Sequence, residues 1–145
     1  MRKPIVGLLA LAAALGPAGC LQSSKDRYIA DYQPLNDRIL KVNDRIVDTL
    51  NTPSSPGKLS RELTPLSGQL TRLGRQIADL DTPEDLRQES AALSRSLTRT
   101  GEGAGRTAVA AREADGPALV HATRDLADDV NALIRRSQRL AEAAG

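Results

Sequence analysis

The sequence predicts an all-α fold, an up-down-up-down four-helix bundle, and three observations predict it. Apolar residues recur every three or four positions along four segments, the spacing of a helix face that packs against its neighbours. No stretch alternates between apolar and polar residues as a half-buried strand does. The links between the four segments are short and rich in turn-forming residues, and short links join antiparallel helices.

The first predicted helix carries an apolar face from Tyr28 to Leu50. Pro34 lies inside this segment, but the apolar spacing continues in phase across it. We therefore expect one helix with a bend or a late start, not two helices. The turn-forming segment 51–57 should end it. The apolar face consists of Tyr28, Tyr32, Leu35, Ile39, Val42, Ile46 and Leu50.

The second predicted helix extends from Leu59 to Leu80, with Pro65 near its start. Beyond it, Thr82 and Pro83 have the order of a helix cap and a first helical residue. Two acidic residues follow them, so we expect the third helix to begin here. The apolar face of the second helix consists of Leu59, Leu63, Leu66, Leu70, Leu73, Ile77 and Leu80.

The third predicted helix contains glycines at 101, 103 and 105, which lower its helix propensity. A three-helix bundle with this segment as a loop is therefore the alternative fold. The turn at 115–117 then leads into the fourth helix. The inward residues of the third helix are Leu86, Ser90, Leu93, Leu97, Thr100, Ala104, Ala108 and Ala111, and those of the fourth are Leu119, Ala122, Leu126, Val130, Leu133, Ser137 and Leu140.

The first 19 residues have the pattern of a secretory signal peptide. Arg2 and Lys3 form a basic head, residues 5–15 are apolar, and small residues precede Cys20. The apolar run is shorter than the roughly 20 residues that a membrane-spanning helix needs. The segment Pro17-Ala18-Gly19-Cys20 resembles the lipobox of bacterial lipoproteins, in which the cysteine receives a diacylglyceryl group before the signal peptide is removed. The match lies at the last three residues, whereas Pro17 replaces the usual aliphatic residue.

The lipobox resemblance implies three parts: a signal peptide at 1–19, a lipidated Cys20 with a polar tether at 20–25, and a helical domain at 26–145. Two or three acyl chains, palmitate among them, anchor a protein stably where one does not. The domain would then lie outside the cytoplasm. Leu21 is not the aspartate that retains such lipoproteins at an inner membrane, so a cell membrane and an outer membrane both remain open.

The domain is also loosely similar to small uncharacterised lipoproteins of high-GC Gram-positive bacteria. The similarity rests on the leucine spacing and on helix starts of the kind seen at Leu80-Asp81-Thr82-Pro83. It implies no particular activity.

Charge and composition argue against nucleic-acid binding. The chain has 20 basic and 18 acidic residues, and removing Arg2 and Lys3 leaves 18 of each in the mature part. Nucleic-acid-binding domains need basic residues clustered on one face. Tyr28 and Tyr32 are the only members of the Phe, Trp and Tyr class, so platforms for base stacking are missing.

Few side chains offer chemistry. His121 is the only histidine and Cys20 the only cysteine, so neither a transition-metal site nor a cofactor is expected. No nucleophilic serine motif occurs, and the glycine-rich segment lacks the spacing of a phosphate loop. We interpret Asp125, Asp128 and Asp129 as a solvated acidic face. The chain is therefore predicted not to be an enzyme.

These observations favour a non-enzymatic envelope lipoprotein, a tethered bundle that binds an envelope protein or the cell wall. The alternative is a sensory bundle that binds a small apolar ligand. The oligomeric state stays open. We expect recognition at the end of the bundle far from the anchor, where the helices either pack unusually close or leave a pocket ringed by Ile46, Leu50, Leu59 and Leu63. The small residues at this end are Ala104, Ala108, Ala111, Ala118 and Ala122.

Overall fold

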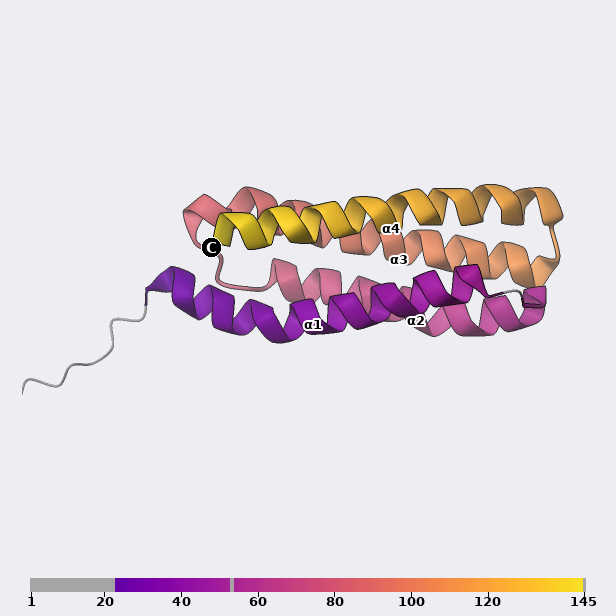
Figure 1. Cartoon of the computed structure of the whole chain (residues 1–145), viewed down its shortest axis with the longest axis horizontal. Helices are drawn as coiled ribbons and strands as arrows, with labels where there is room; N and C mark the ends of the chain where they lie inside the picture. Colours follow the sequence, from indigo (N-terminus) through magenta and orange to yellow (C-terminus); the bar gives the residue numbers. More distant parts are fainter. Residues whose placement is uncertain (1–22, 53, 145) are drawn as a thin grey trace, which may run out of the picture.

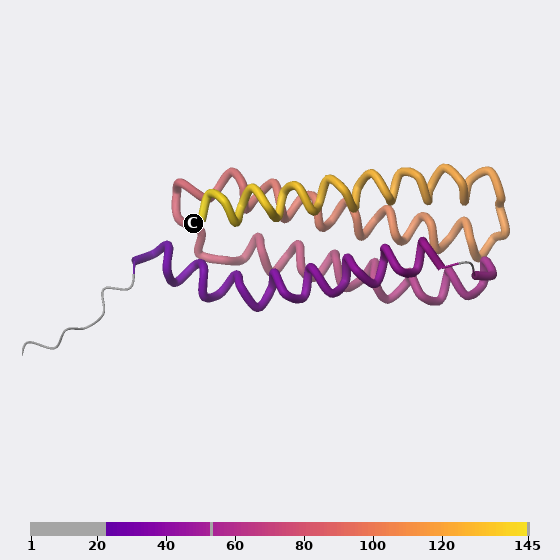
Figure 2. Tube along the Cα trace, in the orientation of Figure 1, coloured from indigo at the N-terminus to yellow at the C-terminus, as the bar shows by residue number. Residues whose placement is uncertain are grey.

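The computed structural model describes residues 23–52 and 54–144, which form an antiparallel bundle of four long helices (Figures 1 and 2). This confirms the predicted fold class. The helices are α1 (Ser24–Asn51), α2 (Pro56–Ala78), α3 (Arg87–Glu113) and α4 (Gly116–Ala144), with a short 3-10 helix, η1 (Glu84–Leu86), before α3. No strand occurs in the described ranges.

The two ends of the bundle differ in what they hold. One end, which we call the near end, holds the start of α1 and the end of α4 (Figure 1). There the Lys25 ammonium donates a hydrogen bond to the Ala143 carbonyl, at 3.1 Å. The links from α1 to α2 and from α3 to α4 lie at the opposite, far end.

Helix α1 begins earlier than the sequence suggested. The Ser23 hydroxyl accepts a hydrogen bond from the Asp26 amide, and the Asp26 carboxylate accepts one from the Ser23 amide. This reciprocal capping box satisfies two amides that the first helical turn leaves free. The predicted tether at 20–25 was therefore wrong at its end, because Ser24 and Lys25 already belong to the helix. Beyond them, α1 continues without interruption across Pro34.

Helix α2 begins after its own cap. The Ser55 hydroxyl accepts from the Lys58 amide, and Pro56 occupies the first helical position, where its missing N–H costs nothing. Pro65 lies inside the helix. The segment ends at Ala78, so the last residue of the predicted apolar face, Leu80, packs against the core from the following link.

The predicted start of α3 was wrong in detail. Thr82 does not cap a helix, because its hydroxyl instead donates to the Leu80 carbonyl, at 3.1 Å. Pro83 precedes η1 without a side-chain cap, and α3 begins only at Arg87. From there α3 is helical without a break to Glu113, so the alternative with a glycine-rich loop is also wrong.

The link between α3 and α4 is only two residues long. Ala114 adopts the left-handed conformation, with φ at 55°, and ends α3. The Asp115 carboxylate then accepts from the Ala118 amide, at 2.9 Å. Gly116 and Pro117, predicted as part of a turn, therefore already lie in the first turn of α4.

The predicted apolar faces meet in one core. Most of their residues are buried, and the few that remain partly exposed lie toward the helix ends or flanks. Burial of these aliphatic side chains is the main favourable term in folding. The largest fully buried side chains are Tyr28, Ile39, Ile46, Leu63, Leu66, Leu70, Ile77, Leu86, Leu93, Leu97, Leu126 and Leu133.

Two stacked tyrosines close the near end of the core. The rings of Tyr28 and Tyr32 lie 5.9 Å apart between centroids. The Tyr32 hydroxyl donates to the Asn36 side-chain oxygen at 3.0 Å, and the Ser137 hydroxyl of α4 donates to the same oxygen at 2.9 Å. The Tyr28 hydroxyl is buried beside Ser90 without a hydrogen bond of good geometry. Burial raises the pKa of both phenols, so both stay neutral at ordinary pH.

Helices α2 and α3 come into close contact at two glycines. Each of these glycines is the last residue of the same sequence pattern. Ser-x-x-Leu-Thr-Arg-x-Gly occurs at 67–74 in α2 and at 94–101 in α3. A Cβ on Gly74 would lie 2.8 Å from the Thr98 hydroxyl and 3.0 Å from the Ser94 carbonyl. A Cβ on Gly101 would lie 2.8 Å from the Thr71 hydroxyl and 2.9 Å from the Ser67 carbonyl. The contacts are reciprocal, so a local two-fold relation joins the two segments.

These contacts generate a stability prediction. We expect Gly101→Ala to destabilise the protein by about 1–3 kcal/mol, because the new methyl group would push against the backbone of α2. In an open helical position the same change is stabilising by up to about 1 kcal/mol. Urea denaturation measures the difference.

Gly68→Ala is the matched control in α2. The nearest atom to its added Cβ is the Arg72 Nη1, 3.5 Å away at the end of a flexible side chain. This variant should be at least as stable as the parent protein. Equal stability of the Gly68→Ala and Gly101→Ala variants would contradict the close approach of α2 and α3.

Candidate functional site

Two hollows between α3 and α4 gather charged and apolar side chains, and together we call them the α3–α4 groove. Its half toward the near end is polar, and its half toward the far end is largely apolar. The polar half is lined by Arg95, Ser96, Arg99, Asp128, Asp129 and Arg136. The apolar half is lined by Val109, Ala110, Ala118 and Ala122, with Arg106, Glu113, His121 and Asp125 among them.

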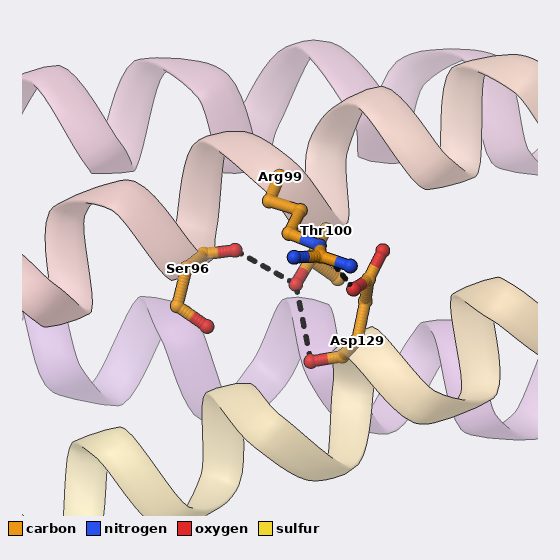
Figure 3. Close-up of polar contacts among 4 residues, drawn as sticks. All are labelled: Ser96, Arg99, Thr100 and Asp129. Atoms are coloured by element: carbon orange, nitrogen blue, oxygen red, sulfur yellow. Dashed lines mark hydrogen bonds and ion pairs between the residues drawn. The ribbon is translucent and has the colours of Figure 1, made fainter.

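Asp129 lies in the polar half and is only 7% exposed. Its carboxylate pairs with the Arg99 guanidinium, with 2.7 Å between Nε and Oδ1 (Figure 3). Its backbone carbonyl accepts from the Thr100 hydroxyl at 3.3 Å, and the same hydroxyl also donates to the Ser96 carbonyl at 2.8 Å. Asp129 is therefore joined to α3 by both its side chain and its backbone.

A glycine on α3 makes room for this carboxylate. A Cβ on Gly103 would lie 3.2 Å from the Asp129 Oδ2 and 3.5 Å from Leu126. A larger residue at 103 would crowd the carboxylate, which would have to shift by a few tenths of an ångström. The missing side chain at this position therefore favours the close contact of Asp129 with α3. Gly101 thus allows α2 to approach α3, whereas Gly103 makes room for side chains of α4.

The burial of Asp129 corrects the sequence interpretation. Asp125 and Asp128 are exposed as expected of a solvated face, but Asp129 is not. Its position three residues after Leu126 and four before Leu133 places it on the flank of the apolar face of α4. That spacing was the available signal. Its partner Arg99 could not be identified from α4 alone, because the two residues meet only when α3 and α4 pack.

The ion pair orients Arg99 without covering it. The Arg99 side chain is 76% exposed, whereas that of Asp129 is 8% exposed. Arg99 uses its Nε for Asp129, and its side chain lines the polar half of the groove together with Arg95 and Arg136. The arrangement suits ionic recognition.

The five alanines predicted for the recognition end divide into two groups. Ala104, Ala108 and Ala111 are buried in the bundle, with exposed fractions of 0%, 4% and 2%. Ala118 and Ala122 line the apolar half of the α3–α4 groove. The lipidation residue predicted from the sequence, Cys20, lies outside the described residues.

The residues expected to ring a shallow apolar pocket do not line the α3–α4 groove. Ile46 and Leu63 are fully buried core residues, and Leu50 and Leu59 are partly buried against the same core. The small residues of α3 accompany close helix packing instead. The apolar surface at the far end therefore lies outside the core, where Val109 is 41% exposed.

Within 23–52 and 54–144, no three metal-ligating side chains come together, and no helix is long and apolar enough to cross a membrane. His121 is exposed in the apolar half of the α3–α4 groove. The groove thus offers guanidinium groups, carboxylates and a short apolar surface, which allow ionic and apolar contacts with a binding partner.

The Arg99–Asp129 pair can be tested through stability. We expect Arg99→Ala to destabilise the protein by about 1–3 kcal/mol, because it leaves the buried Asp129 carboxylate without its charged donor. Arg95→Ala is the control, one turn earlier in the same groove, and surface substitutions of this kind usually stay within about 0.5 kcal/mol. Thermal or urea unfolding compares them. Equal losses in the two variants would show that the ion pair contributes nothing specific.

Comparison of the chain with protein-family models, with curated proteins and with solved structures returned no match. The function is therefore inferred from the contacts, burial and charge of the described residues.

Proposed function

We propose that the protein is a lipid-anchored, non-enzymatic bundle of the cell envelope that binds another envelope protein through the apolar half of the α3–α4 groove. The observation that carries the proposal is an apolar surface placed far from the proposed anchor. Val109, Ala118 and Ala122 supply it, and Val109 is 41% exposed. An exposed apolar patch among polar residues is typical of protein-binding surfaces.

The proposed anchor and the bundle are separated by a short stretch of chain. The predicted lipidated residue, Cys20, precedes the first residue of α1 by four positions. Four residues span at most about 14 Å. With Cys20 in the lipid, the near end of the bundle would stand directly against the headgroups.

Helix length then determines how far the binding surface reaches. Ala122 lies 22 residues before Ala144, the last residue of α4. At 1.5 Å per residue this separation is about 33 Å along the helix. The apolar half of the groove would therefore face away from the membrane, within reach of another envelope protein.

One experiment tests both parts of the proposal. A photo-crosslinking amino acid replaces Val109 in the parent protein and in a Cys20→Ser variant, both made in a bacterial host. With Cys20 intact, the protein should fractionate with membranes and give a discrete crosslinked product. With Cys20→Ser, lipidation is blocked, so the protein should leave the membrane fraction and the product should decrease.

The crosslinker at Val120 is the positional control. Val120 is 70% exposed at the same end of α4 but does not line the groove. The same products from both positions would reject the groove as the binding surface. Quantitative membrane association of the Cys20→Ser variant would reject the lipid anchor, and it would do so independently of the crosslinking result.

A further inference from the structure

We propose that the outer groove between α1 and α2 binds an oxyanion, a carboxylate or phosphate group, through Arg72 and Arg38. We call it the α1–α2 groove. This inference goes beyond the proposed function and depends neither on the lipid anchor nor on the α3–α4 groove. It follows from the local two-fold relation between α2 and α3.

The two-fold relation makes Arg72 and Arg99 equivalent. Both occupy the arginine position of the repeated pattern, two residues before the glycine at which the helices meet. The reciprocal contacts of Gly74 and Gly101 show that the two patterns are also equivalent in space. The side of α2 that carries Arg72 toward α1 therefore corresponds to the side of α3 that carries Arg99 toward α4.

The two arginines differ in what faces them. Arg99 is bound by the carboxylate of Asp129 from the neighbouring helix, at 2.7 Å. The groove that contains Arg72 is lined by Arg38, Val42, Gln69, Arg72, Leu73 and Gln76, so no acidic side chain lines it. Helix α1 contributes a second guanidinium where α4 contributes a carboxylate. An external oxyanion would provide the Arg72 guanidinium with a negatively charged partner, as the Asp129 carboxylate does for Arg99.

The lining of the α1–α2 groove suits such a ligand. Two guanidinium groups and two side-chain amides can all donate hydrogen bonds, and a guanidinium matches a carboxylate or phosphate with two parallel donors. Val42 and Leu73 are 6% and 4% exposed and supply the apolar part of the lining. The groove is open to solvent and has a volume of about 360 Å³, which accommodates a small oxyanion.

Arg72 is also directed along the helix surface. A Cβ on Gly68, one turn earlier, would lie 3.5 Å from the Arg72 Nη1. The guanidinium thus lies over the glycine of its own helix. The Arg72 side chain lines the groove together with Gln69.

Nuclear magnetic resonance of the purified protein can test the site, with inorganic phosphate and acetate as separate probes and chloride at equal ionic strength as the reference. We expect saturable shifts at the Arg72 and Arg38 Nε–H groups and at the Gln69 and Gln76 amides. The better of the two probes identifies the oxyanion class. Arg72→Gln should weaken the binding at least about tenfold, because it removes one charged, bidentate partner.

Arg61→Gln is the matched control for charge, since Arg61 is an exposed residue of α2 outside the groove. It should leave the shifts unchanged. Shifts that rise without saturation for both probes, that chloride reproduces, or that persist in Arg72→Gln would overturn the proposal.

Asp129→Asn offers a reciprocal test of the two-fold argument. This change removes the charge of the internal carboxylate and leaves the Arg99 guanidinium able to bind an external oxyanion. The variant should gain a second saturable response, at the Arg99 Nε–H, while the response at Arg72 remains. A folded Asp129→Asn protein without any new response at Arg99 would contradict the equivalence on which the proposal rests.

Discussion

The close approach of α2 and α3 at Gly74 and Gly101 is the constraint on which the rest of the structure depends. Each glycine meets the Ser-x-x-Leu-Thr segment of the other helix, at distances that a Cβ would violate. Because the backbones meet there, Leu70 and Leu97 lie at the crossing and are fully buried. Well-packed cores of this kind tolerate little change in volume. The crossing also aligns the two repeated segments in opposite directions, which places Arg72 and Arg99 on opposite flanks of the pair.

Small residues on more than one face of α3 allow both α2 and α4 to pack closely against it. Gly101 allows α2 to approach, Gly103 accommodates the Asp129 carboxylate of α4, and Ala104 and Ala108 pack in the core. The same residues weaken α3 as an isolated helix. Packing against α2 and α4 therefore compensates for low local propensity, a common balance in proteins, where tertiary contacts supply most helical stability. The polar contacts of Thr100 and Arg99 then join α3 to α4.

The sequence predicted the four apolar faces because burial follows the helical period so directly, as at Leu63, Leu66 and Leu70. It left the glycine-rich segment open because propensity alone cannot distinguish a loop from a closely packed helix. Thr82 was misassigned because two residues of favourable type do not guarantee cap geometry. Asp129 was misassigned because its burial depends on Gly103 and Arg99, which only packing brings near. The repeated pattern at 67–74 and 94–101 is present in the sequence but entered no prediction, because only the contacts of Gly74 and Gly101 show that it marks the crossing.

Amide hydrogen exchange tests the central claim most directly, because exchange rates report how readily each segment opens. If the glycine-rich part of α3 is held by close contact with α2, the amides of residues 98–108 should exchange as slowly as those of residues 66–77. Both segments should then open only with the whole bundle. Exchange at 98–108 that is faster by about a hundredfold or more would mean that this part of α3 opens on its own. Such a result would contradict the close packing of α3 against α2 on which this account of the fold depends.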